Sequence, residues 1–239
     1  MATRLQKRLK RGRDWFRDRA KGVDYAEAGS TPHRLRAYLG ADGTFDYEYY
    51  KRVQTEGNKR KLANVFADEA TCRVICDALI EDGVKVARAL CHGSRNGAEL
   101  KWFADMLGCE ATGTDISDTA TQFENMVQWD FHEPREEWKG AFDLVYTNSH
   151  DHAYDPVRAL RTWAGQLAPG GRLVVEHTDA HLPGAVNELD PFGIEAVAFP
   201  YFVLEASEGG TERFAVRRVV RPDHKKKGRD IWLFLIGRD

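Results

Sequence analysis

The sequence has no long hydrophobic run and only four cysteines in 239 residues. No apolar stretch approaches the roughly 20 residues that a membrane-spanning helix needs, and the segment Met1 to Leu5 lacks the apolar core of a secretion signal. The cysteines show neither a disulfide-rich pattern nor the CxxC spacing of metal sites. These absences argue against a membrane-spanning or disulfide-stabilised protein and predict a cytoplasmic one.

The length and composition are those of an ordinary globular protein. Hydrophobic residues make up 42% of the chain and charged residues 30%, enough for one sizeable core with a small appendage. The formal net charge of -2 is unevenly spread, because residues 1–21 hold nine Lys and Arg against two Asp, and residues 212–239 hold nine against four acids. The basic ends suit either a nucleic-acid or anionic-membrane contact, or simply solvated surfaces.

From residue 86 onward, strand-like and helix-like patterns alternate. Helices are expected at about Gly97–Leu107, Ser117–Phe123 and Pro156–Leu167. Between them, strands are expected at Val86–Cys91, Glu110–Thr114, Met126–Trp129, Phe142–Thr147 and Gly171–Glu176. Strands and helices in regular succession predict a parallel sheet with right-handed crossovers. In such sheets the functional residues gather at the carboxyl ends of the strands.

The two ends of the chain depart from this alternation. The strand patterns Arg213–Val220 and Asp230–Gly237 are too close for a crossover helix, so they must pair as an antiparallel hairpin. Ahead of the alternation, helices are expected over residues 1–21, around His33–Leu39, from Asp46 onward and over Ala67–Leu79. The predicted fold is therefore α/β: a doubly wound, mostly parallel seven-stranded sheet with a C-terminal antiparallel hairpin. Residues 1–62 would form an N-terminal helical extension or lid, and residues 63–239 a Rossmann-like domain.

A glycine turn follows the first strand of the alternation. The turn Gly93-Ser94-Arg95-Asn96-Gly97 opens a helix, and Asp115 ends the next strand about 20 residues later. Glycines let the backbone approach a ligand closely, and the free N–H groups of the helix attract an anion. A carboxylate at the second strand end can accept both ribose hydroxyls. This unit predicts a site for an adenosine-bearing cofactor.

Six features in order resemble the class I S-adenosylmethionine-dependent methyltransferases over roughly residues 67–239. They are the glycine turn, Asp115, Gln128-Trp129-Asp130-Phe131, Phe142 to Ser149, Leu167-Ala168-Pro169-Gly170-Gly171 and the terminal hairpin. The resemblance implies that the cofactor is S-adenosylmethionine. A nicotinamide-dependent oxidoreductase is disfavoured, because its purely parallel fold does not end in such a hairpin.

The resemblance also implies a role for each matching position. Gly93 and Gly97 would line the methionine part of the cofactor, Asp115 would bind the ribose, and Asp130 would accept from the adenine amino group. Phe131 or Ile116 would pack on the adenine, and Asn148 and Ser149 would form the floor near the sulfonium. Two departures stand out, since the family usually has an acid at Cys91 and a glycine at Arg95. Arg95 could instead bind the cofactor carboxylate.

Candidate catalytic residues follow the fourth and fifth strands, in Ser149-His150-Asp151-His152 and Glu176-His177-Thr178-Asp179-Ala180-His181. Three interpretations remain open. One histidine, His150 or His177 with Asp151 nearby, deprotonates a hydroxyl, because imidazole titrates near neutral pH. Alternatively, a divalent metal such as Mg²⁺ is bound by Asp151, His152, Glu176 and Asp179, or the histidines only bind substrate or cap loops.

The predicted function is O-methylation of a small-molecule or saccharide hydroxyl, with substrate contacts from Tyr50, Gln54, Lys59, His152 and His181. The Asn/Asp-Pro-Pro-Tyr/Phe signature of methyltransferases acting on bases or glutamine is absent, since Asn148 is followed by Ser149 and His150. Two alternatives are an RNA methyltransferase that uses the basic termini to bind phosphates, and a non-catalytic nucleoside-binding or membrane-surface module.

Overall fold

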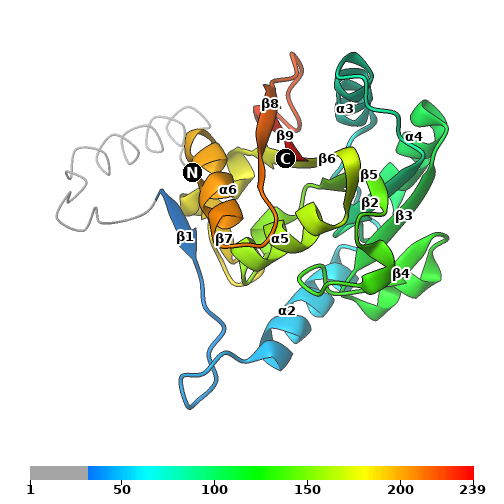
Figure 1. The fold of residues 1–239 in the computed structure, drawn as a ribbon. Helices are drawn as coiled ribbons and strands as arrows, with labels where there is room; N and C mark the ends of the chain where they lie inside the picture. The colour runs from blue at the N-terminus through cyan, green and yellow to red at the C-terminus, as the bar shows by residue number, and fades with distance from the viewer. Residues whose placement is uncertain (1–31) are drawn as a thin grey trace, which may run out of the picture. The chain divides into compact units, whose positions relative to one another are not determined.

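A computed structural model describes residues 32–239 of the chain (Figure 1). The helix predicted for residues 1–21 lies outside these described residues. Residues His33–Asp239 form one structural unit. The helix at Tyr47–Arg60 therefore belongs to the same unit as the sheet. The proposed division of the chain at residue 62 stays a prediction.

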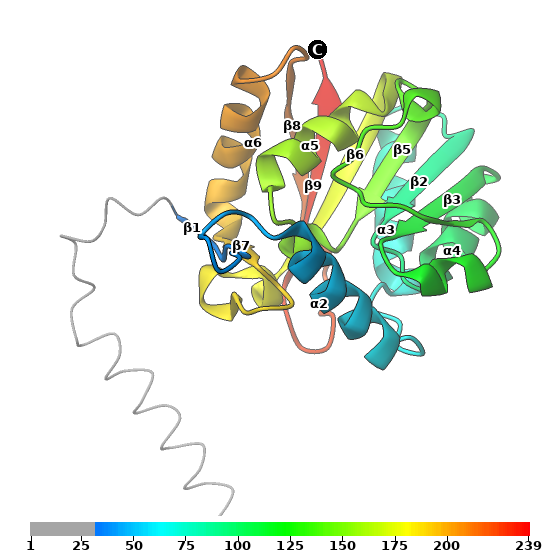
Figure 2. The same cartoon turned by 90° about the horizontal axis from the view of Figure 1, so that it is seen from below.

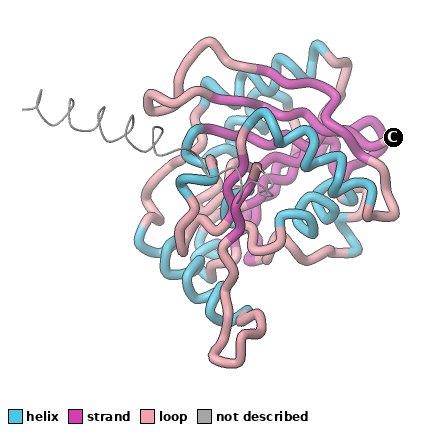
Figure 3. Tube along the Cα trace, turned by 90° about the vertical axis from the view of Figure 1, so that its left-hand side faces the viewer, coloured by secondary structure: helices cyan, strands magenta, loops and turns pink. Residues whose placement is uncertain are grey.

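A seven-stranded sheet runs through this unit in the order β4-β3-β2-β5-β6-β9-β8. Helices surround its strands (Figure 3). The parallel strands are β2 (Arg88–His92), β3 (Glu110–Asp115), β4 (Met126–Gln128), β5 (Phe142–Thr147) and β6 (Leu167–Thr178). The last two strands, β8 (Phe214–Val220) and β9 (Ile231–Arg238), pair antiparallel, and β9 also pairs antiparallel with β6. The predicted fold class is therefore confirmed, including the terminal hairpin.

Helices cover both faces of the sheet (Figure 2). One apolar core contains residues of α5 (Pro156–Gly165) and α6 (Phe199–Glu208), and a second contains residues of α3 (Glu69–Glu81) and α4 (Ala98–Leu107). One more helix, α2 (Tyr47–Arg60), comes before these four in the chain. In the described residues, no helix is long and apolar enough to cross a membrane.

Short-range hydrogen bonds fix where several helices begin. The side chains of Asp46, Asp68 and Asp155 each accept a hydrogen bond from the backbone N–H three residues later. Such N-caps satisfy donors that the first turn of a helix leaves free. Gly108, in the left-handed conformation, ends α4 and turns the chain into β3.

One local prediction was wrong. The segment expected as a helix from His33 contains the strand β1 (His33–Leu35), which pairs antiparallel with β7 (Phe192–Ile194). A partner strand some 160 residues away in the sequence supplies its hydrogen bonds, so the tertiary pairing overrides the local pattern. The helix expected over Ser117–Phe123 is present as a 3₁₀ helix at Asp118–Gln122.

Helix α3 offers a matched test of core packing. Leu79 is fully buried in the core shared with α4, whereas its neighbour Ile80 is 62% exposed. Leu79→Ala should lower the free energy of unfolding by about 2–5 kcal/mol, because it leaves a cavity. Ile80→Ala should change it by no more than about 0.5 kcal/mol. Urea unfolding monitored by circular dichroism measures both, and equal effects would contradict the assigned face of the helix.

Candidate functional site

The carboxyl ends of the parallel strands surround a cavity, and the empty space there, including the part open to solvent, is about 500 Å³. Its walls come from α2 and from the segments after β2, β3, β4 and β5. The lining residues are Tyr50, Gln54, Gly57, Asn58, Gly93, Arg95, Asp115, Ile116, Asp130, Phe131, Ser149, His152 and Leu189. Seven of the nine residues predicted to bind the cofactor therefore line one cavity: Gly93, Arg95, Asp115, Ile116, Asp130, Phe131 and Ser149.

The turn after β2 requires glycine for two separate reasons. Gly93 and Gly97 have φ angles of 70° and 71°, in the left-handed region. A Cβ at position 93 would also lie 2.6 Å from the Cβ of Ser149. The backbone therefore passes directly against the segment after β5, as expected for a turn that lies close to a ligand.

Asp115 is anchored at the end of β3 by the backbone. One carboxylate oxygen accepts from the N–H of Arg95 at 3.1 Å, and the other accepts from the N–H of Ser117 at 2.9 Å. The side chain is 8% exposed, and burial raises its pKa. A carboxylate oxygen can accept two hydrogen bonds, so Asp115 keeps acceptor capacity toward the cavity.

Asp130, just after β4, connects the sheet to α2. Its Oδ1 accepts from the backbone N–H and ring Nδ1 of His132, at 2.9 and 2.7 Å, and its Oδ2 accepts from the hydroxyl of Tyr47 at 2.9 Å. Burial opposes its ionisation, but the hydrogen bonds and charge of His132 outweigh it and lower the pKa of Asp130. Asp130 is therefore an ionised acceptor at the cavity wall.

Helix α2 contributes the opposite wall. Asn58 accepts from the hydroxyl of Thr119 at 2.9 Å, and the buried Tyr50 donates to the backbone carbonyl of His152 at 3.2 Å. Gly57 permits the helix to pass Leu189, since a Cβ there would lie 2.3 Å from a Leu189 methyl carbon. Lys59, predicted to contact substrate, instead forms an ion pair with Asp118 at 3.1 Å and does not line the cavity.

Ser149 and Asn148, which the resemblance assigns to the floor near the sulfonium, follow β5. The Ser149 hydroxyl contacts the carbonyl of Gly93 at 3.3 Å and Asn148 Oδ1 at 3.1 Å. Ser149 also lines a second, adjoining hollow, which it shares with Asn148 and Gly93. The other residues of that hollow are Lys61, Asn64, Val65, Phe66, Ala67, Ser94, Arg95, Asn96, Glu99, Asp151, His152, Ala180, His181 and Asp190.

His152 lies between the cavity and this hollow in a fixed orientation. Its Nδ1 is 2.8 Å from Gln54 Oε1 and 3.0 Å from the carbonyl of Leu189. Both neighbours are acceptors, because the Gln54 amide nitrogen itself donates to Leu189. Nδ1 must then carry the proton in the neutral ring, and the lone pair is on Nε2. Nε2 lies 4.0 Å from Asp151 Oδ1 and 3.8 Å from Asp190 Oδ1.

Asp151 is the buried acid of this group. It is 7% exposed, and its Oδ1 has no hydrogen-bond partner among the described residues. Its Oδ2 is 3.8 Å from Nε2 of His181. Burial raises the pKa of Asp151 to about 6, although the nearby His152 opposes the shift.

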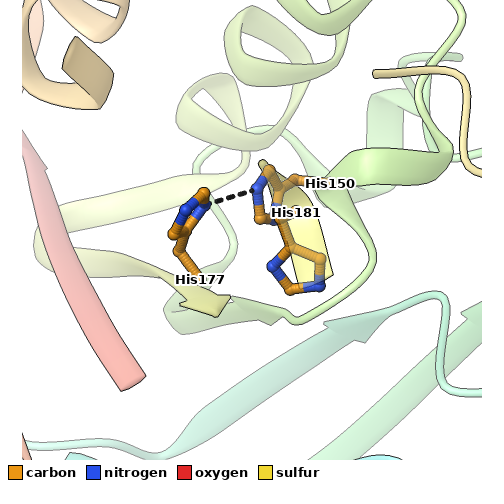
Figure 4. Close-up of side chains that lie close together, drawn as sticks. All are labelled: His150, His177 and His181. Carbon is orange, nitrogen blue, oxygen red and sulfur yellow. Dashed lines mark hydrogen bonds between the residues drawn. The ribbon is translucent and has the colours of Figure 1, made fainter. Parts of the chain in front are cut away.

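His150 and His177, the two predicted bases, lie next to each other (Figure 4). His150 Nε2 is 3.2 Å from His177 Nδ1, both side chains are buried, and neither lines the cavity or the adjoining hollow. Burial lowers the pKa of His177 to about 4 and that of His150 well below its usual value. His181 completes the trio, and its Nδ1 accepts from the backbone N–H of Thr178. At neutral pH these three buried imidazole rings are therefore uncharged.

The four residues predicted for a metal do not come together. Asp151 and His152 lie with Asp190, and their potential ligand atoms are within 4.8 Å of one another. Glu176 instead accepts from the Tyr146 hydroxyl at 2.6 Å and from Lys226, and Asp179 is exposed. Among the described residues, the trio of His150, His177 and His181 is a second group with metal-ligand spacing.

Sequence reasoning did not assign several residues to the site, above all Tyr47, Gly57 and Leu189. A glycine inside a helical pattern was the one available signal for Gly57, because such a glycine often marks a close approach. Nothing in the sequence pairs Tyr47 with Asp130, 83 positions away.

Comparison with known proteins agrees with this geometry. Residues 90–175 match the family model described as a methyltransferase domain. No curated protein sequence matches the chain significantly.

Solved structures share the fold at low identity. A Burkholderia thailandensis 1,6-didemethyltoxoflavin N1-methyltransferase, with S-adenosylhomocysteine bound, is 16% identical with a TM-score of 0.61. The match covers 86% of this chain and 93% of that one. The mitomycin 7-O-methyltransferase MmcR is 16% identical (TM-score 0.53; 80% and 60% covered), and the [4+2]-cyclase SpnF is 12% identical (TM-score 0.58; 86% and 98% covered).

At these identities the structural matches establish the fold and not the reaction, as the presence of a cyclase among them illustrates. The family model adds evidence from sequence, because residues 90–175 include the glycine turn, Asp115, Asp130 and Ser149. Residues 90–175 therefore match a methyltransferase domain, and the fold of the chain is that of the class I S-adenosylmethionine-dependent methyltransferases.

Proposed function

We propose that the protein transfers a methyl group from S-adenosylmethionine to a hydroxyl of a small molecule or saccharide, with His152 as the base. The observation that carries this proposal is the orientation of His152, whose Nδ1–H is fixed by Gln54 and Leu189. Its Nε2 lone pair is therefore available at the boundary between the cavity and the adjoining hollow. This replaces His150 and His177 as the preferred base, because burial removes both from the cavity.

The cavity residues fit the cofactor. Asp115 offers acceptor capacity to ribose hydroxyls, Phe131 and Ile116 offer apolar surface to the adenine, and Gly93 leaves room because no Cβ fits there. When bound, the cofactor supplies an electrophilic methyl group on a sulfonium. The protein must then align the acceptor and exclude water.

Side chains of the protein can accept the proton that the acceptor hydroxyl loses during methyl transfer. A hydroxyl needs a base as it attacks, and Nε2 of His152, which has the lone pair when Nδ1 carries the proton, can accept the hydroxyl proton. The carboxylates of Asp151 and Asp190, about 4 Å from Nε2, would stabilise the positive charge that the ring gains. A free amine acceptor needs much less help, so a preoriented base favours a hydroxyl.

The alternatives have less support. The RNA methyltransferase reading needs free cations, but much of the basic C-terminal region is paired with carboxylates, through Arg217, Arg218, Arg221, Lys225, Lys226 and Arg238. A fixed orientation of His152 would serve no purpose in a module that only binds a nucleoside and carries out no reaction.

Asp115→Ala tests the cofactor site. Loss of a hydrogen-bonded carboxylate should weaken S-adenosylhomocysteine binding by about 1.5–3 kcal/mol, measured by isothermal titration calorimetry. Asp105→Ala, on the exposed side of α4, is the control and should bind normally. Unchanged affinity in Asp115→Ala would refute the ribose assignment, and no binding by the natural protein would refute the proposed function.

His152→Gln tests the base. The acceptor turned over best in a screen of hydroxyl-bearing small molecules with methyl-labelled cofactor is used for the assay. The turnover number should fall by about 10²- to 10⁴-fold, the usual contribution of general base catalysis, while S-adenosylhomocysteine affinity changes little. His224→Gln, on the loop beside α3, should retain turnover. Normal turnover in His152→Gln would remove His152 from the mechanism.

Chelation separates the base from the metal interpretation, which the unpartnered oxygen of Asp151 also allows. If His152 acts as the base, dialysis against EDTA should leave the turnover number unchanged. Activity that is lost on dialysis and restored by Mg²⁺ would instead identify Asp151, His152 and Asp190 as metal ligands.

A further inference from the structure

Three histidines from two neighbouring strand ends meet in the interior of the protein. His150 follows β5, His177 lies near the end of β6, and His181 ends the short 3₁₀ helix after β6. Each ring offers one nitrogen, and the three nitrogens lie within 4.8 Å of one another (Figure 4). The residues are 3%, 0% and 8% exposed. Polar groups this deeply buried cost free energy unless they have partners, so the cluster needs an explanation.

Hydrogen bonds among the described residues do not satisfy the cluster. His150 Nε2 contacts His177 Nδ1 at 3.2 Å, and only one of these two nitrogens can carry the shared proton. The other nitrogens of the two neutral rings, His150 Nδ1 and His177 Nε2, have no partner among the described residues. One of them is therefore an N–H without an acceptor, and the other is a lone pair without a donor. The neighbouring Phe199 ring packs against both imidazoles and is no substitute for either partner.

The spacing of the two contacting nitrogens is that of two ligands on one metal ion. Zinc binds imidazole nitrogens at about 2.0–2.1 Å with tetrahedral angles, which places two such nitrogens roughly 3.3–3.4 Å apart. The distance of 3.2 Å between His150 Nε2 and His177 Nδ1 is close to this value. Imidazole suits zinc and other first-row transition metals, whereas Mg²⁺ and Ca²⁺ prefer oxygen ligands.

His181 gives the cluster a path to solvent and a nearby carboxylate. It lines both the hollow next to the cavity and a further hollow beside the loop between β8 and β9. Its Nδ1 accepts from the backbone N–H of Thr178 at 3.0 Å, so Nε2 carries the proton and lies 3.8 Å from Asp151 Oδ2. An ion at Nδ1 would displace the Thr178 N–H, and Nε2 would keep its proton toward Asp151. Histidines that bind a metal commonly donate their second N–H to a carboxylate in this way.

Charges of both signs lie near His181. Lys226 and Arg229 act on its ring with positive charge, but Lys226 is paired with Glu176, and Arg229 is exposed to solvent and its screening. Asp151 contributes a buried carboxylate whose Oδ1 has no partner among the described residues. Asp151 can therefore offset part of the charge that a divalent ion would bring.

We propose that His150, His177 and His181 bind a zinc ion. The ion would be structural, because neither His150 nor His177 lines the cavity or the adjoining hollow. It would connect the segment after β5 to the end of β6 and so fix the start of the segment that contains His152. The inference does not depend on the proposed reaction, since it concerns only what these three residues bind.

Zinc binding is measured on the full-length protein after dialysis against EDTA. Isothermal titration calorimetry with Zn²⁺ alone should show one ion bound per chain. The melting temperature should rise by about 5–10 °C when free Zn²⁺ is a hundredfold above its dissociation constant, because the ion binds only the folded state. Absence of binding to the natural protein would overturn the inference.

Four variants locate the ion. His177→Gln and His181→Gln each remove a ligand and should weaken zinc binding by more than about 100-fold, the upper range for loss of a second partner of a metal ligand. Asp190→Asn, in the other candidate group, and His224→Gln, between β8 and β9, are the matched controls and should bind zinc normally. Circular dichroism shows which variants are folded. Undiminished zinc affinity in folded His177→Gln and His181→Gln would contradict the assignment.

X-ray absorption at the zinc edge tests the site in the natural protein, without any variant. The spectrum should show three imidazole nitrogens at about 2.0–2.1 Å from the ion. The group of Asp151, His152 and Asp190 contains only one imidazole, so a spectrum with a single imidazole would place the ion there and overturn the inference. Any of these failures would leave the proposed function intact, because cofactor binding and turnover are measured separately.

Discussion

The site depends on the parallel pairing of β2 with a strand on each side. His92, the last residue of β2, is in register with Thr114 of β3 and Thr147 of β5. Its buried ring contacts the Thr114 hydroxyl and the Gln166 side chain, both at 2.8 Å, and its carbonyl accepts from the Thr147 hydroxyl. Burial lowers the pKa of His92 to about 4, so the ring is neutral at physiological pH. These contacts keep β2, β3 and β5 in register at their carboxyl ends. The residues that follow each strand therefore meet around one cavity.

Much of this arrangement could be predicted from the sequence, because the signals are local. Apolar runs that end in glycine or aspartate identify the strands and the turn after β2. Gly93, Asp115 and Asp130 lie at these strand ends, where a parallel sheet must bring them together. Because the order of strands in such folds follows general rules, the position of the cavity could be predicted as well.

What could not be predicted depends on contacts between distant segments. β1 forms a strand only because β7 lies beside it, and Asp190 reaches His152 from a loop 38 positions later in the chain. The histidines illustrate the same limit. His150 and His152 are two residues apart, yet one ring is packed against Phe199 in the interior and the other lines the cavity. Their chemistry differs because of burial, which neither residue type nor spacing reveals.

Helix α2 contacts the segment after each of three strands. Asn58 accepts from Thr119 after β3, Tyr47 donates to Asp130 after β4, and Gln54 contacts His152 after β5. One rigid helix therefore both forms a wall of the cavity and orients the imidazole. Any displacement of α2 from the sheet that admits water also breaks the shorter of the two contacts that set the tautomer of His152 and leaves only the Leu189 carbonyl. The enclosure of the cavity and the orientation of the ring are thus coupled through Gln54.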